Sequence, residues 1–100
     1  MKGQKKSIKH LDPVYVNQVN VLRALCQEGT LVGQGKQLDI TQIANVTGLG
    51  DEKEVLRLLY ILEGHKLVSP FPAGDFTSKI WQVTDDGLKV YRNIASELVQ

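Results

Sequence analysis

Hydrophobic residues recur at helical spacing in four segments of this chain. The spacing predicts helices over residues 13–27, 40–49 and 51–65, and a last helix that begins with Thr84 as its N-cap. Between the third and fourth helices the period shortens toward two, so residues 67–68 suit an incoming strand and residues 79–83 an outgoing strand. The connection over residues 70–78 is rich in turn-forming residues. The pattern therefore predicts helices, then a β-hairpin, then one more helix.

Polar residues mark where these helices begin. Asp12 stands before a proline, and this pair is typical of a helix start because Asp caps free N–H groups and proline is tolerated in the first turn. Asp39 with Gln42 and Asp51 with Glu54 both match capping-box spacing. These pairs predict that the second and third helices begin immediately after Asp39 and Asp51.

The segment over residues 29–37 has three glycines among polar residues and is predicted to be a loop. It lacks the ending of a phosphate-binding loop, because Lys36 is followed by Gln37 where Ser or Thr is needed. Residues 37–40 are predicted to form a short strand that pairs with the hairpin.

The third helix has two different sides. Its core-facing residues are Val55, Leu58, Leu59 and Leu62, and the residues on the opposite side are Lys53, Arg57, Tyr60 and Gly64. A helix that is packed on one side and exposes a few polar groups on the other meets the requirement for reading a DNA groove. A solvated helix face is the alternative. On the outgoing strand, Trp81 and Val83 alternate onto the face expected to join the core.

Two stretches of the chain carry a family resemblance. Leu62-Glu63-Gly64-His65-Lys66-Leu67-Val68, followed by a hairpin and then Val83-Thr84-Asp85-Asp86-Gly87, resembles the MarR-like and PadR-like winged-helix regulators. Lys66 stands where those families usually have Gly, and Val83 where they usually have Leu. The resemblance implies an α+β, mostly helical winged helix-turn-helix: three helices, a β-hairpin wing and a C-terminal helix. It also implies a dimeric DNA-binding transcription factor, with the third helix in the major groove and the wing against phosphates or the minor groove.

Length and composition predict one small domain. The 100 residues divide into a basic, flexible arm over residues 1–11 and a winged-helix domain over residues 12–100. No apolar run is long enough to span a membrane, and no apolar stretch follows the basic N-terminus, as a secretory signal would require. One cysteine excludes an intrachain disulfide. These features predict a soluble, cytoplasmic protein that is not bound to a membrane.

Charge is distributed unevenly along the chain. The net charge is +1, yet four of the 12 basic residues lie within the first ten positions. From residue 11 onward eight basic residues face 11 acidic ones, so this part carries 8 − 11 = −3. Because DNA binding is driven largely by counterion release at basic surfaces, binding needs a local basic face or help from the arm.

Candidate DNA-binding residues follow from these patterns. They are Lys53, Arg57 and Tyr60 on the third helix, Thr41 and Gln42 on the second, Lys79 at the base of the wing, and Lys5, Lys6 and Lys9 in the arm. Arg57 is expected to reach a guanine edge, and the arm is expected to follow phosphates or enter a minor groove. A solubilising tail is the alternative for the arm. Phe71 and Phe76 are expected either to contact a partner or to cover the hairpin core.

The first and last helices have wider apolar faces than one neighbouring helix needs. This surplus predicts a homodimer with twofold symmetry, with Val14, Val21, Val90 and Ile94 between the subunits.

The sequence gives little support for a redox, metal-binding or catalytic role. Cys26 lies on an apolar helical stripe and is expected to be an inert core residue rather than a redox sensor. No metal site, cofactor site or catalytic group is indicated, and the sequence does not reveal a small-molecule effector. The chain is therefore expected to be a non-enzymatic, DNA-binding transcriptional regulator, with double-stranded DNA and a second copy as its partners. The alternative is a winged-helix protein–protein interaction module within a larger assembly, which the acidic body favours.

Overall fold

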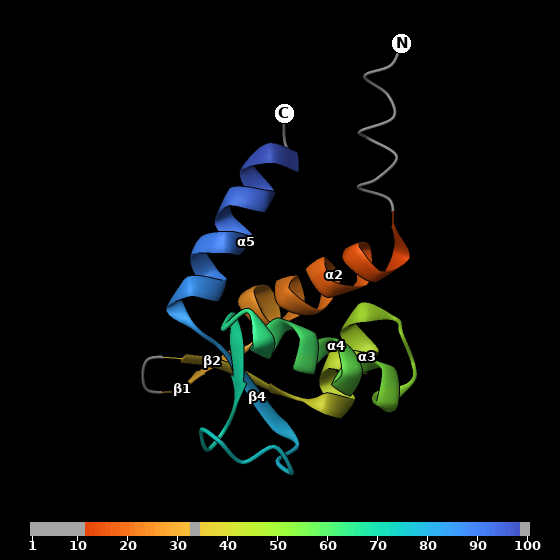
Figure 1. The fold of residues 1–100 in the computed structure, drawn as a ribbon, viewed down its shortest axis with the longest axis vertical. Coiled ribbons are helices and arrows are strands. Elements are labelled where there is room, and N and C mark those ends of the chain that lie inside the picture. Colours follow the sequence, from red (N-terminus) through yellow and green to blue (C-terminus); the bar gives the residue numbers. More distant parts are fainter. Residues whose placement is uncertain (1–11, 33–34, 99–100) are drawn as a thin grey trace.

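The computed structural model describes residues 12–32 and 35–98, which form four helices and a four-stranded antiparallel sheet. In chain order the elements are α2 (Pro13–Glu28), β1 (Thr30–Val32), β2 (Gly35–Asp39), α3 (Ile40–Thr47), α4 (Glu52–Gly64), β3 (Val68–Pro70), β4 (Ile80–Val83) and α5 (Asp85–Leu98). The fold is therefore α+β and mostly helical, as predicted. Figure 1 shows α5 extending to one end of the molecule, while the turn between β3 and β4 lies at the other end.

The sheet confirms the predicted hairpin. Its strand order is β1-β2-β4-β3, and β3 pairs with β4 in a register that places Val68 opposite Val83. The expected strand near residues 37–40 is also present, because β2 pairs with β4 and sets Leu38 opposite Trp81. Two strands far apart in the sequence thus meet at the central residue Trp81.

The prediction of a loop over residues 29–37 is wrong for most of that segment. Residues Thr30–Val32 form β1, which pairs antiparallel with β2 so that Thr30 lies opposite Gln37. Strand β1 consists of Thr30, Leu31 and Val32, and three residues are too few for a period of two to be detected. Its pairing with β2 uses backbone groups, which every one of these residues supplies.

Helix starts largely agree with the capping patterns. Asp39 and Gln42 form the complete capping box: the Gln42 N–H donates to Asp39 Oδ1 (2.8 Å) and the Asp39 N–H donates to Gln42 Oε1 (3.0 Å). Asp51 caps α4 through the N–H of Lys53 (3.0 Å). The predicted reciprocal role of Glu54 is wrong, because the Glu54 carboxylate instead accepts two hydrogen bonds from a guanidinium, and charged donors form stronger bonds than a backbone N–H.

The joint between α4, β3 and α5 explains two features of the sequence. Lys66 adopts a left-handed conformation, with φ of 64°, at the position where the resembling families usually have glycine. Thr84 caps α5 by accepting from the Gly87 N–H (3.0 Å), and its hydroxyl donates to the carbonyl of Lys66 (2.8 Å). A Cβ on Gly87 would lie 2.1 Å from the carbonyl oxygen of Leu67, so only glycine allows α5 to approach this closely.

The core lies between the sheet and helices α2, α3 and α4. The predicted inward side of α4 is confirmed, because Val55, Leu58 and Leu59 are fully buried and Leu62 nearly so. Trp81 also joins the core, as expected, together with Val83. Burying these apolar side chains together supplies the main stabilisation of the fold.

Cys26 is also part of this core. Burial raises the pKa of its thiol to about 11, although Lys36 and Arg92 act in the opposite direction. A thiol that stays protonated is a poor nucleophile. The expectation of an inert core cysteine therefore agrees with the structure.

The four predicted interface residues do not share one environment. Val21 is fully buried within the single chain, so the prediction that it lies between subunits is wrong. The physical reason is that α2 contacts α3, α4 and α5, so the two apolar stripes of α2 are partly covered inside one chain. Val14 remains exposed, and Val90 and Ile94 on α5 are half-buried.

Among the described residues, no helix is long and apolar enough to cross a membrane.

Candidate functional site

The outer side of α4 presents the three residues that the sequence nominated. Lys53, Arg57 and Tyr60 are exposed, whereas the opposite side of the helix is buried in the core. One helical turn separates each of these residues from the next, so the three form a line along α4. We call Lys53, Arg57 and Tyr60 the α4 stripe.

Arg57, in the middle of the α4 stripe, is already paired. Its Nη2 lies 2.7 Å from Oε2 of Glu54, and its Nε lies 3.1 Å from Oε1 of the same carboxylate. These hydrogen bonds lower the pKa of Glu54 and raise the pKa of Arg57. Sequence reasoning missed this pair, although the spacing of three residues along a helix could have revealed it.

Tyr60, at the end of the α4 stripe, belongs to an aromatic cluster. Its ring centroid lies 6.0 Å from that of Phe76 and 5.9 Å from that of Trp81, and Phe76 and Trp81 are themselves 6.0 Å apart. Edge-to-face and tilted arrangements of this kind are favourable between aromatic rings. Of the two readings for Phe76, the structure shows the ring packed against the hairpin core, with 42% of the residue still exposed.

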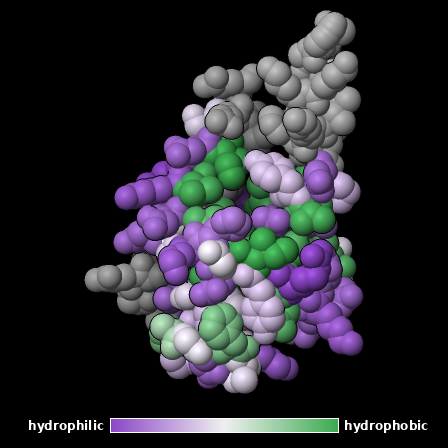
Figure 2. Space-filling view, in the orientation of Figure 1, coloured by the Kyte–Doolittle hydropathy of each residue, from purple (hydrophilic) through white to green (hydrophobic). Residues whose placement is uncertain are grey.

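The β3–β4 turn (residues 71–79) is fixed by its own side chains. The Ser78 hydroxyl donates to the carbonyl of Phe71 (2.6 Å) and accepts from the N–H of Ile80 (3.0 Å). Asp75 accepts from both the N–H and the hydroxyl of Thr77. In Figure 2, the lower end of the face shown, over this turn, mixes moderately hydrophobic atoms with neutral and hydrophilic ones.

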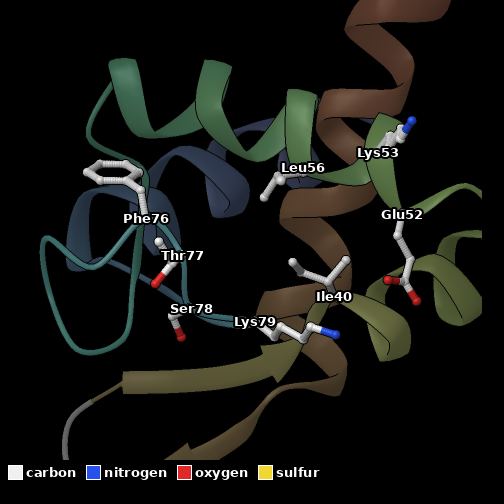
Figure 3. Close-up of a pocket in the computed structure, with 8 residues that line it drawn as sticks. All are labelled: Ile40, Glu52, Lys53, Leu56, Phe76, Thr77, Ser78 and Lys79. Atoms are coloured by element: carbon white, nitrogen blue, oxygen red, sulfur yellow. The ribbon is translucent and has the colours of Figure 1, made fainter.

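A groove of about 300 Å³ separates the start of α4 from the β3–β4 turn. Its lining residues are Ile40, Glu52, Lys53, Leu56, Phe76, Thr77, Ser78 and Lys79. Figure 3 shows Leu56 reaching from α4 toward Ile40, while Phe76 lies at one end of the groove and Glu52 at the other. The groove therefore combines an apolar centre with a charged rim, and its volume suits one or two side chains better than a larger ligand.

The remaining nominated residues lie around this groove. The Thr41 hydroxyl donates to Glu52 (2.8 Å), and Gln42 is engaged in the cap of α3. Lys79 is exposed on the rim of the groove. Within residues 12–32 and 35–98, Arg57–Glu54 is the only ion pair, so the ammonium groups of Lys53 and Lys79 have no carboxylate within ion-pair distance there. Lys5, Lys6 and Lys9 lie outside the described residues.

The electrostatic character of this surface is mixed. The cations Lys53, Arg57 and Lys79 share it with the carboxylates of Asp51, Glu52, Glu54 and Asp75. Carboxylates near the N-terminus of α4 are stabilised by the helix dipole, but they also repel phosphates. The surface thus offers a few discrete cationic contacts rather than a broad positive field.

This arrangement can bind a partner through hydrogen bonds, cationic contacts and aromatic surface. In the part of the chain that the structure describes, no group of three His, Cys, Asp or Glu residues is placed to hold a metal ion. No protein-family model matches the chain, and no curated protein or solved structure matches it either.

Proposed function

We propose that this chain is a winged-helix domain that binds double-stranded DNA as a homodimer and acts as a transcriptional regulator. In this proposal α3 and α4 are the helix-turn-helix, β3, the β3–β4 turn and β4 are the wing, and α4 is the recognition helix. Two observations support the fold assignment. Residues 48–51 join α3 to α4 through a short turn that contains Gly48 and Gly50 at positive φ, and the hairpin follows α4 directly.

The observation that carries the DNA proposal is the placement of the α4 stripe. The helix has 13 residues, so it is about 20 Å long, and its inner side is anchored in the core. An anchored helix of this size with exposed Lys53, Arg57 and Tyr60 fits the major groove, which is about 12 Å wide. Lys79 lies across the groove from α4 and would approach the phosphates beside the recognised bases.

Charge limits how this binding can occur. The body carries −3 from residue 11 onward, and Lys2, Lys5, Lys6 and Lys9 supply a concentrated positive charge outside it. Phosphate contacts release counterions, so affinity falls with salt in proportion to the number of contacts. With few cations on the body, we expect a shallow salt dependence to which the arm contributes a large share.

The test is a binding assay of the full chain on short randomised duplexes at two salt concentrations. We expect binding at low salt, a modest loss at higher salt, and enrichment of a preferred sequence after repeated selection. Failure of the full chain to bind any duplex at low salt would refute the proposal.

A second candidate function is a protein–protein interaction module. The groove between α4 and the β3–β4 turn favours it, because its centre is apolar and Phe76, which lines it, remains exposed, as does Phe71 in the same turn. Exposed aromatic residues are enriched at protein interfaces. Absence of DNA binding, together with a partner that cross-links to a photoreactive residue at position 76 and is lost in a Leu56→Asp variant, would favour this candidate.

A further inference from the structure

We propose that Glu54 is a positioning residue that holds the Arg57 guanidinium ready to read a guanine. The inference rests on the proposed DNA-binding function and assigns a role within it that the sequence pattern did not indicate. In this role Glu54 acts through Arg57 and makes no contact with the DNA itself.

The geometry of the pair decides which donors remain available. An arginine has five N–H donors: one on Nε and two on each terminal nitrogen. Glu54 occupies the Nε donor and one donor of Nη2, which together form one edge of the planar group. The neighbouring edge, formed by Nη1 and the second donor of Nη2, is not used by Glu54.

This free edge matches a guanine. In the major groove guanine presents two acceptors, N7 and O6, and a pair of parallel guanidinium donors satisfies both at once. The Arg57 side chain is 51% exposed, whereas that of Glu54 is 32% exposed, so the arginine is the more accessible member of the pair. Lysine cannot replace arginine in this role, because its ammonium group is a point charge without a planar fork.

Glu54 has two opposing effects on DNA binding. By ordering the long arginine side chain in advance, it lowers the entropy cost of making the base contact. Its negative charge also weakens the attraction between this part of α4 and the phosphates. The pair should therefore favour discrimination between sequences over affinity for DNA of any sequence.

Lys53 and Glu63 provide contrasts on the same helix. Lys53 has no ion-pair partner within the described residues, so its ammonium group suits a phosphate contact that carries no sequence information. Glu63 carries the same charge as Glu54 but lies near the other end of α4, does not line the groove and is not the ion-pair partner of Arg57. Glu63→Ala is therefore the matched control for Glu54→Ala.

The experiment selects a preferred site from randomised duplexes with the full chain. It then measures the ratio of affinities for that site and for a duplex in which one G·C pair is changed. Arg57→Lys should reduce the ratio at one G·C position about tenfold, because the bidentate contact is lost. Glu54→Ala should reduce the ratio at the same position roughly threefold to tenfold. This factor corresponds to the entropy cost of immobilising one long side chain on binding, which the variant would have to meet. Binding to DNA lacking the site should not weaken in Glu54→Ala.

A double-mutant comparison separates positioning from a general structural effect. If Glu54 acts through Arg57, adding Glu54→Ala to Arg57→Ala should leave the discrimination ratio unchanged. The inference is overturned if Glu54→Ala keeps the wild-type ratio, if Glu63→Ala lowers the ratio equally, or if the losses caused by Glu54→Ala and Arg57→Ala simply add. No binding of the wild-type chain to any duplex would refute the DNA-binding function and this inference together. Binding without dependence on Glu54 would refute only the inference.

Discussion

The ring of Phe76 in the β3–β4 turn lies 6.0 Å from the ring of Tyr60 on α4, in an edge-to-face arrangement. Trp81 of β4 completes the cluster from the core side. The contact links the helix that carries the α4 stripe to the turn that carries Lys79. The two halves of the candidate site are therefore held in a fixed relation by aromatic packing.

Removing the Phe76 ring should loosen this link. We expect Phe76→Ala to lower the free energy of unfolding by about 1 kcal/mol more than Phe71→Ala does. This difference is the typical stabilisation from an aromatic pair beyond the burial of its surface. Phe71 is the matched control because it is 43% exposed, close to the 42% of Phe76, and no ring contact is seen for it within the described residues. Urea denaturation measures both variants, and equal losses would contradict a stabilising role for the cluster.

The left-handed conformation of Lys66 should cost stability. A residue with a Cβ is disfavoured at a φ of 64°, whereas glycine adopts it readily, so Lys66→Gly should raise the free energy of unfolding by about 1 kcal/mol. Lys89→Gly, at an exposed position inside α5, should instead lower it by about 1 kcal/mol. Thermal unfolding of the two variants tests the contrast, and a loss of stability in both would argue against strain at Lys66.

The buried thiol of Cys26 should make stability depend on alkaline pH. Its pKa rises from 9.0 to about 11 on folding, so the unfolded chain loses this proton at lower pH than the folded chain does. The stabilisation is complete below about pH 9 and disappears as the pH rises toward 11. Cys26→Ala should show a smaller loss of stability over this interval in denaturant titrations. An identical pH dependence in both proteins would show that other groups cause the loss.

Arg57 and the basic arm should affect DNA binding in different ways. Arg57→Ala should cost roughly 1–3 kcal/mol on the preferred site and relax sequence preference. Deleting residues 1–9 should weaken binding to all sequences alike and flatten the salt dependence, because its lysines act on phosphates. Titrations on specific and randomised duplexes distinguish the two effects. A uniform loss in Arg57→Ala would mean that this residue contacts phosphate.

The proposed dimer should depend on the apolar residues that the single chain leaves accessible. Light scattering at micromolar concentration should give the mass of two chains, and an Ile94→Asp variant should give the mass of one. Val46→Asp is the control, because Val46 is 48% exposed on α3 and plays no part in the proposed interface. A monomer mass for the wild-type chain would refute the dimer, and monomerisation by both variants would point to general destabilisation.

The sequence by itself determined the helices, their beginnings and the hairpin. Helical periodicity, the Asp39–Gln42 capping box and the Thr84 cap depend on residues within one or two turns of each other, so they can be read without knowing the fold. The inner side of α4 could be predicted for the same reason. The exposure of Lys53, Arg57 and Tyr60 followed directly, because residues opposite a buried stripe must face outward.

Only the tertiary structure decided which neighbour each surface meets. Val21 is buried because α2 contacts α3, α4 and α5, and Phe76 packs on Tyr60 because the β3–β4 turn lies beside α4. Strand β1 exists because β2 supplies backbone partners, and a strand of three residues is too short to show a strand period in the sequence. Local patterns encode the elements, whereas contacts between distant residues decide how their surfaces are used.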